Sequence, residues 1–260
     1  MKDIILCDRS NYKATSLLCK QYGVSVNIDT FSETDIYDVS LEEVNRNLMS
    51  YRDVKIVSIH GPYRDLCLGS KDKLIQSATM ARFEYAYKIS TLLNCPNLIL
   101  HHGYIPGTSS PSNWVKRAKI FFNEFLSDKD NSISIHIENQ FEHTPVLISE
   151  VVSAVNDSRL KICLDVGHAN CNSKTSVLNW IEQLNDKISF AHLHNNNGLT
   201  DQHLNFTSGT IDFKEICFTL EKYSPDCIWG IETNSLDDTD RSIQWLIDNH
   251  YLQKRKAPMN

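Results

Sequence analysis

The chain has 260 residues, of which 41% are hydrophobic, and its formal net charge is −6. This length is typical of one α/β barrel, and such a chain buries a sizeable core without disulfides or a structural metal. The acidic balance gives no electrostatic basis for nonspecific nucleic-acid binding, and no stretch approaches the roughly 18 apolar residues of a membrane span. We expect one domain over residues 1–260, with a flexible tail at 251–260.

Short β-rich segments recur along the chain and alternate with longer helical patterns. They are rich in Ile, Val and Leu, as expected of buried parallel strands. The first lies in "MKDIILCDRS", which lacks the long apolar run and cleavage site of a signal peptide. The eight predicted strands are residues 3–8, 24–30, 54–60, 97–103, 132–139, 160–168, 188–195 and 227–233.

Helical patterns lie between these strands, and the longest falls within residues 74–93. Capping residues precede three of them: Ser40 and Glu43 before 41–52, Thr144 and Pro145 before 146–155, and Asp212 and Glu215 before 216–223. Short connections favour parallel pairing and right-handed crossovers. Eight β/α units predict a (β/α)8 TIM barrel of the α/β class. An open doubly wound sheet is the alternative, but the first turn lacks its glycine-rich motif.

Polar side chains gather at the carboxyl ends of six consecutive predicted strands. In a barrel these ends form one rim, which carries the active site. One such residue alone is more often structural, but six strands in agreement indicate a cluster. Clustered carboxylates repel one another at such a rim, and a divalent cation removes that cost. The residues are His60, His101, His102, Glu138, Asp165, His168, His192, His194, Asp201, His203 and Glu232.

The motifs at these strand ends resemble those of the xylose isomerase-like TIM barrels. They read "HGPY", "HHG", "HIEN", "LDVGH", "HLHNNNG…DQH" and "GIET", and they extend over residues 54–235. That superfamily includes sugar and sugar-phosphate isomerases and epimerases, related dehydratases and AP endonucleases of the endonuclease IV kind. Its isomerase branch implies one divalent metal, held at the positions matching Glu138, Asp165, His192 and Glu232. Imidazole and carboxylate ligands together suit zinc or manganese better than calcium.

The endonuclease branch resembles the chain at further positions. Its three-metal site implies up to three ions and five more ligands, which match His60, His101, His168, Asp201 and His203. Tyr63 falls where that branch has a DNA-contacting tyrosine. Two features depart from the branch: its Gly-Glu-Gly turn is replaced by "TSG" at 207–209, and its basic loop after the second strand is acidic. The acidic loop, which opposes the approach of a duplex, carries Asp29, Glu33, Asp35 and Asp38.

We therefore expect a metal-dependent isomerase or epimerase that acts on a small sugar or sugar phosphate. Such an enzyme removes a proton next to a carbonyl and returns it elsewhere, so a carboxylate base must lie beside the metal. Glu138 and Glu232 are the predicted proton-transfer groups, although each could equally act only as a ligand. The predicted substrate contacts are Tyr63, His102, Asn139 and His194.

Two other functions stay open at this point. An endonuclease IV-like phosphodiesterase that acts on abasic DNA would use two or three metals. A noncatalytic sugar- or metal-binding barrel would need no base. The sequence specifies no oligomeric state. Its eight cysteines form no C-x-x-C pair, and several lie in apolar runs, as Cys163 and Cys217 do. We expect reduced thiols and a cytoplasmic location without a membrane partner.

Overall fold

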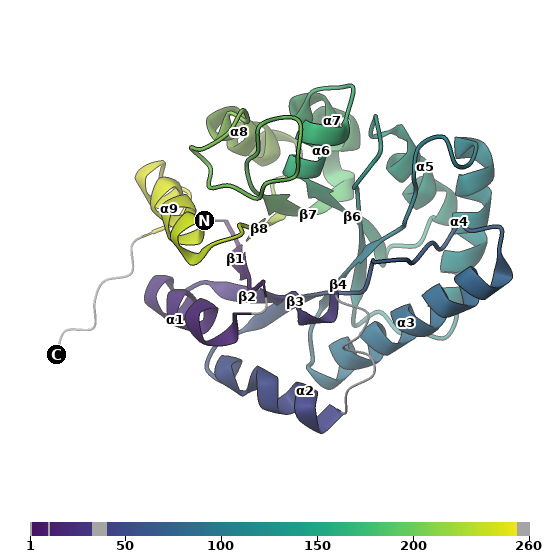
Figure 1. Ribbon diagram of the computed structural model, residues 1–260, viewed down its shortest axis with the longest axis horizontal. Helices are drawn as coiled ribbons and strands as arrows, with labels where there is room; N and C mark the ends of the chain where they lie inside the picture. Colours follow the sequence, from purple (N-terminus) through teal and green to yellow (C-terminus); the bar gives the residue numbers. More distant parts are fainter. Residues whose placement is uncertain (1, 10, 33–40, 254–260) are drawn as a thin grey trace.

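Eight parallel strands form a closed barrel in the computed structural model, which describes residues 2–9, 11–32 and 41–253. The strands pair in chain order, and β1 (Ile4–Cys7) also pairs with β8 (Ile228–Ile231), which closes the ring. The helices surround this ring (Figure 1). The predicted (β/α)8 TIM barrel is confirmed, and the open doubly wound sheet is excluded.

The elements follow one another in strict alternation up to the sixth strand. The remaining strands are β2 (Ser25–Ile28), β3 (Ile56–His60), β4 (Asn97–His101), β5 (Ser134–Glu138), β6 (Leu160–Asp165) and β7 (Ile188–Leu193). The α-helices are α1 (Tyr12–Tyr22), α2 (Leu41–Leu48), α3 (Lys73–Leu92), α4 (Pro111–Leu126), α5 (Val146–Val155), α6 (Val166–Asn172), α7 (Val177–Leu184), α8 (Phe213–Tyr223) and α9 (Leu236–Asp248). Short 3-10 turns are η1 (Thr30–Ser32), η3 (Met49–Tyr51) and η4 (Asn185–Lys187).

Strand β6 is three residues shorter than the sequence pattern predicted. It ends at Asp165, whose Oδ1 accepts a hydrogen bond from the backbone N–H of His168 at 2.6 Å. This N-cap starts a helix at once, so residues 166–168 belong to α6 and not to the strand. Helix α6 is an addition before α7, and the described residues carry nine α-helices where eight were expected.

The predicted helix starts have different outcomes. Asp212 is the N-cap of α8, because its Oδ1 accepts from the backbone N–H of Lys214 at 2.9 Å. Pro145, not Thr144, occupies the N-cap of α5, so that prediction was off by one residue. The longest helix is α3, as predicted among the described residues. Ser40 lies outside the described residues.

Two apolar layers support the barrel. The larger one lies between the strands and the helices, and it includes a set of edge-on aromatic contacts between Phe83 of α3 and Phe121 and Phe125 of α4. A smaller cluster, separate from it, consists of inward-facing strand residues. Its members are Ile5, Val57, Ile99, Cys163 and Phe190. The inner cluster closes the barrel interior, so a ligand can approach the strand ends only from the rim.

The ends of the described chain also bear on the sequence predictions. Tyr251 stacks against Trp245 and lies 5.3 Å from Trp229, measured between ring centroids. The first residues of the expected tail are therefore packed, and residues 254–260 lie outside the description. The eight cysteines are free thiols. Among the described helices, none combines the length and the apolar character of a membrane span.

The cap at α8 gives a prediction about stability. Asp212→Ala removes an acceptor for two orphan backbone N–H groups at an exposed helix start, and it should lower the free energy of unfolding by about 1 kcal/mol. Urea denaturation measures this change. Asp212→Asn is the matched control, because asparagine caps equally well. Equal losses in both variants would contradict a capping role.

Candidate functional site

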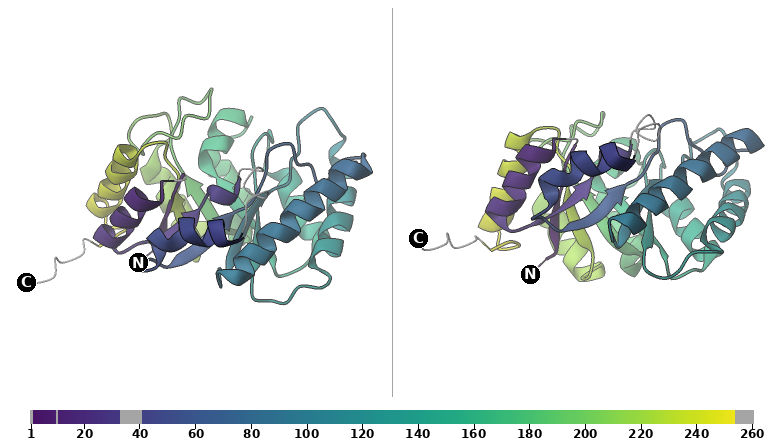
Figure 2. Two further views of the ribbon diagram at one scale, coloured as in Figure 1. Left: turned by 60° about the horizontal axis from the view of Figure 1, so that its bottom comes forward. Right: turned by 90° about the horizontal axis from the view of Figure 1, so that it is seen from below.

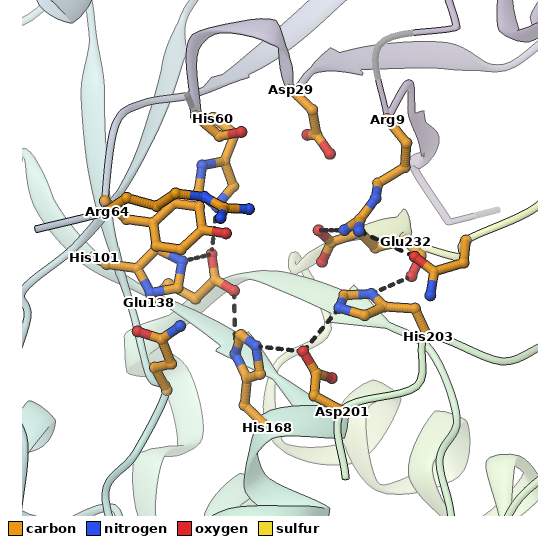
Figure 3. Close-up of a pocket in the computed structure, with 14 residues that line it drawn as sticks. Arg9, Asp29, His60, Arg64, His101, Glu138, His168, Asp201, His203 and Glu232 are labelled. Carbon is orange, nitrogen blue, oxygen red and sulfur yellow. Dashed lines mark hydrogen bonds and ion pairs between the residues drawn. The ribbon is translucent and has the colours of Figure 1, made fainter. Parts of the chain in front are cut away.

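A cavity of about 350 Å³ opens at the carboxyl ends of the strands. The loop that follows β7 stands above this rim (Figure 2). Figure 3 shows the wall side chains pointing toward a common space. Seven of the nine predicted ligands line the cavity, and these are His60, His101, Glu138, His168, Asp201, His203 and Glu232. The other two, Asp165 and His192, are fully buried beneath its wall.

The strand ends place these side chains as the sequence predicted. Strands β3, β4, β5 and β6 end with their polar residue, and Glu232 directly follows β8. The register aligns neighbours across the sheet: His101 pairs with Glu138, and Asp165 pairs with His192. Because all strands are parallel, their last side chains meet at the same end of the barrel.

The deepest part of the site is organised around His192. Its Nδ1 lies 3.2 Å from Glu138 Oε1 and 3.2 Å from Glu232 Oε2, and 3.9 Å from Asp165 Oδ2. None of these contacts has hydrogen-bond geometry, so the buried Nδ1 has no hydrogen-bond partner. Donor atoms bound tetrahedrally to one ion at about 2.1 Å lie roughly 3.4 Å apart. The two 3.2 Å distances from His192 Nδ1 are therefore close to the spacing of ligands that share a cation, and the ligand atoms of all four residues lie within 4.8 Å of one another.

Three other imidazoles are oriented by the backbone. The Nδ1 atoms of His60, His168 and His203 lie 2.8 Å, 2.9 Å and 2.8 Å from the carbonyl oxygens of Gly61, Asn139 and Glu232. A carbonyl only accepts, so Nδ1 carries the proton in each ring. In the neutral ring, Nε2 then presents a lone pair. This arrangement is typical of metal-binding histidines.

Each of these Nε2 atoms faces a carboxylate. His60 Nε2 lies 3.2 Å from Glu138 Oε2, whereas His168 and His203 Nε2 lie 3.3 Å and 2.9 Å from Asp201 Oδ2. A lone pair facing a carboxylate is unfavourable unless a proton or a cation lies between them. The groups His60–His101–Glu138 and His168–Asp201–His203 could therefore each hold an ion beside the Glu138–Asp165–His192–Glu232 group.

The electrostatics of the site reflect these contacts. Burial lowers the pKa values of His168, His192 and His203, but the neighbouring acidic groups outweigh it and raise all three, that of His203 to about 9. These rings therefore hold a proton unless a cation takes its place. Burial alone would raise the pKa of Glu138, but the surrounding imidazoles, with His192 foremost, hold that pKa well below its usual range. Burial likewise opposes the shift at Glu232, where His192, His203 and Arg9 lower the pKa. Burial lowers the pKa of His101 to about 4, so its ring is neutral at physiological pH and available as a ligand.

Several cavity residues were missed by the sequence analysis or given another role, and Arg9 and Asp29 are the charged ones among them that have assigned hydrogen bonds. Arg9 follows β1, and its Nη1 and Nη2 donate to Glu232 Oε1 and Asn234 Oδ1, both at 3.0 Å. Asp29 follows β2 and was expected to act as a rim charge against DNA. It is only 6% exposed and lines the cavity. The other three acidic residues of that segment lie outside the described residues.

Tyr63 lines the cavity, but His102 does not, which corrects the prediction of a substrate contact at His102. His102 is buried, its Nε2 contacts the carboxylate of Glu142, and its Nδ1 accepts from the backbone N–H of Tyr104. Glu142 in turn accepts from the backbone N–H of Gln140 at 2.7 Å. This pair connects the segments after β4 and β5.

Asn139 and His194, two further predicted substrate contacts, form framework contacts in this structure, and their role toward a substrate stays a prediction. The Asn139 amide exchanges two hydrogen bonds with the backbone of Asp165, at 2.8 and 3.0 Å. His194 Nε2 lies 3.1 Å from both carboxylate oxygens of Asp165, and its ring stacks on His203 at 3.8 Å. Both side chains fix the orientation of Asp165.

The comparisons with known proteins agree with this geometry. The family model described as xylose isomerase-like TIM barrel matches residues 19–249. An uncharacterized protein of Methanocaldococcus jannaschii is 30% identical over 223 residues, which cover 79% of this chain and 74% of that protein.

Two solved structures share the fold over their whole length. A D-tagatose 3-epimerase-like protein has a TM-score of 0.80 at 23% identity and covers 96% of this chain and 97% of its own. The IolI protein with a bound zinc atom has a TM-score of 0.77 at 15% identity and covers 97% and 100%. Because the family model spans most of the residues, the chain belongs to the xylose isomerase-like TIM barrel family.

Proposed function

We propose that this protein is a divalent-metal-dependent isomerase or epimerase of a small sugar. One observation carries the proposal: two carboxylates, from β5 and from the end of β8, approach the same His192 nitrogen at 3.2 Å inside one cavity. Proton removal and return next to a carbonyl need two such groups around one polarised substrate oxygen. The D-tagatose 3-epimerase-like neighbour and the zinc-bound IolI neighbour support this direction.

In this proposal Glu138, Asp165, His192 and Glu232 hold the metal, with zinc or manganese as the first choices. When bound, the ion supplies Lewis-acid polarisation of a substrate oxygen. The chain supplies the proton transfer, with Glu138 and Glu232 as the acid and base groups. A carboxylate has about four lone-pair sites, so a glutamate that spends one on a ligand bond can still accept a proton.

In each glutamate, one carboxylate oxygen faces His192 and the other contacts different side chains. These second contacts fix the orientation of the carboxylate. His60 and His101 lie 3.2 and 3.4 Å from Glu138 Oε2. Arg9 Nη1 donates to Glu232 Oε1 at 3.0 Å. Because proton transfer requires a defined approach to the carbon acid, such holding groups contribute by positioning.

A phosphodiesterase of abasic DNA is the alternative, and the His168–Asp201–His203 group favours it. Two or three ions in one site would suit phosphodiester hydrolysis. The excess of negative charge in the cavity wall opposes it, because four carboxylates and two arginines, Arg9 and Arg64, face the space into which a phosphate would enter. In a noncatalytic sugar- or metal-binding barrel, Glu138 and Glu232 would act only as ligands or binding groups. The free thiols support a reducing, cytoplasmic location.

Metal content tests the ligand assignment. The purified protein should carry at least one equivalent of a divalent metal, and titration with zinc or manganese should reach more than one. Glu138→Gln combined with His192→Ala should remove the tightest equivalent, because these residues contribute to the deepest group. His203→Ala should remove only a weaker one. Elemental analysis measures the outcome, and unchanged stoichiometry in both variants would contradict the assignment.

Gly167 provides a test of how the site is oriented. A Cβ at this position would lie 1.9 Å from His194 Cε1, so Gly167→Ala must displace the ring that orients Asp165. We expect about 1–3 kcal/mol of destabilisation and at least about tenfold weaker metal binding. Calorimetric titration and thermal unfolding measure these effects. Gly107→Ala is the control, because it strains the left-handed backbone (φ +86°) of an exposed loop and has no atom within 4 Å of the new Cβ. It should lower stability while leaving metal affinity unchanged.

The proposed reaction predicts proton exchange. The metal-loaded protein, incubated with a panel of ketoses and their phosphates in D2O, should incorporate deuterium next to the carbonyl. Glu138→Gln and Glu232→Gln should each reduce this exchange by at least about 100-fold, as expected for loss of a general acid or base. Mass spectrometry of the recovered sugar provides the readout.

A parallel incubation with a fluorescent abasic-site duplex separates the two enzymatic functions. Metal-dependent strand scission, with no exchange into any sugar, would overturn the isomerase proposal. Absence of both activities from a fully metal-loaded protein would favour the noncatalytic barrel.

A further inference from the structure

Asp29 is a buried carboxylate that the proposed mechanism does not use. It follows β2, is 6% exposed and lines the cavity. In Figure 3 it faces the cavity from the side opposite His168 and Asp201. It also belongs to none of the groups of described residues that could hold a metal ion. Its function must therefore be sought in contacts other than metal coordination.

The framework around Asp29 holds it in one orientation. The backbone N–H of Asp29 donates to Asp8 Oδ1 at 2.9 Å. Ser58 Oγ donates to Asn27 Oδ1 at 2.7 Å, and Asn27 Nδ2 donates to Asp29 Oδ1. Asp8, Asn27 and Ser58 are themselves buried. Such a chain of satisfied polar groups preorganises the carboxylate before a ligand arrives.

The second oxygen of Asp29 has no such partner. Among the described residues, no donor forms a hydrogen bond with Oδ2. Arg9, which also lines the cavity, donates instead to Glu232 and Asn234. Because Asp29 lines the cavity, this oxygen can accept from a ligand that brings an O–H group into it. A hydrogen bond to an ionised acceptor is stronger than one between neutral groups.

The charges around Asp29 restrict what that ligand can be. Glu138, Asp201 and Glu232 face the same cavity, and Arg9 and Arg64 also line it. Arg9 donates to Glu232, and imidazoles contact Glu138 and Asp201. Asp29 is held by its backbone and amide framework instead. A phosphate monoester carries about −1.5 to −2 charges at neutral pH and offers mainly acceptors. It would meet Asp29 as a like charge without a hydrogen bond, whereas a sugar hydroxyl would donate.

We propose that Asp29 forms a hydroxyl-binding subsite, which selects the neutral polyol end of a sugar over a phosphorylated one. This inference rests on the proposed function, because it assumes that the reacting end of the sugar lies at the Glu138–His192–Glu232 group. It narrows the substrate class to unphosphorylated sugars. Asp29 is a binding residue in this scheme and takes no part in proton transfer.

The test compares a ketohexose with its 6-phosphate, using the metal-loaded wild type, Asp29→Asn and Asp29→Ala. In the wild type, deuterium exchange into the free ketohexose should have a higher kcat/KM than exchange into its 6-phosphate. Asp29→Asn should raise the KM for the free sugar by about tenfold, the difference between a charge-assisted and a neutral hydrogen bond. Its kcat should change little, because ground-state binding is what is lost. The ratio of kcat/KM for the free ketohexose to kcat/KM for its 6-phosphate should fall in both Asp29→Asn and Asp29→Ala.

Asp226→Asn is the control, because Asp226 is exposed and lies among the residues of a different cavity. Metal content and thermal unfolding of each variant exclude a purely structural effect. Calorimetric binding of the free ketohexose is measured in parallel. Binding that weakens in Asp29→Asn, without exchange in wild type, would support the subsite and overturn the proposed reaction.

Three results would overturn the subsite itself. The first is exchange in wild type that Asp29→Asn leaves unchanged in KM and in preference. The second is a wild-type preference for the 6-phosphate. The third is a fall in kcat at constant KM, which would make Asp29 a proton-transfer group. If wild type neither binds nor exchanges any sugar of the panel, both the subsite and the proposed function fail.

Discussion

The buried carboxylate of Glu138 is the feature to which the rest of the cavity is adapted. It is 1% exposed, and four imidazoles lie around it: those of His60, His101, His168 and His192, at 3.2, 3.4, 3.6 and 3.2 Å. Burying an ionised carboxylate costs several kcal/mol unless positive charge offsets it. Four protonated rings would repel one another at these distances. One or more shared metal ions offset the carboxylate charge while the imidazole rings stay neutral. The combination of carboxylates and imidazoles therefore favours a metal site over a network of ion pairs.

The barrel supplies this arrangement through its backbone as much as through its side chains. Parallel strands bring their last residues to one rim, and the carbonyl groups just after β3, β5 and β8 accept from the Nδ1 atoms of His60, His168 and His203. Since these carbonyls are fixed by the sheet, they determine which ring nitrogen carries the proton. The fold therefore points the Nε2 atoms of these rings into the cavity before any ion binds. Metal-binding histidines are commonly oriented in this way by a hydrogen bond from their other ring nitrogen.

The sequence predicted which residues reach the rim, because strand ends and parallel topology are properties of local pattern. It failed for contacts that depend on exact strand length. His194 was predicted to be a substrate contact within a strand that extends to residue 195, yet β7 ends at Leu193 and the His194 ring contacts Asp165. Asp29 was interpreted as a loop charge because nothing local reveals the buried framework that directs it into the cavity. Such partners come from distant segments, which a single sequence does not place.

Backbone strain is concentrated at one of the two glutamates. Arg9 and His203 have φ angles of +41° and +49°, which non-glycine residues seldom adopt. Both contact Glu232: Arg9 through Oε1 and His203 through the backbone carbonyl. Strain of about 1–3 kcal/mol per residue persists only where surrounding contacts outweigh it. Glu138 is surrounded by buried imidazoles, whereas Glu232 contacts His192 and is also bound by Arg9, whose side chain is 38% exposed. The two carboxylates are therefore held by different means, and the strained backbone lies on the side of Glu232.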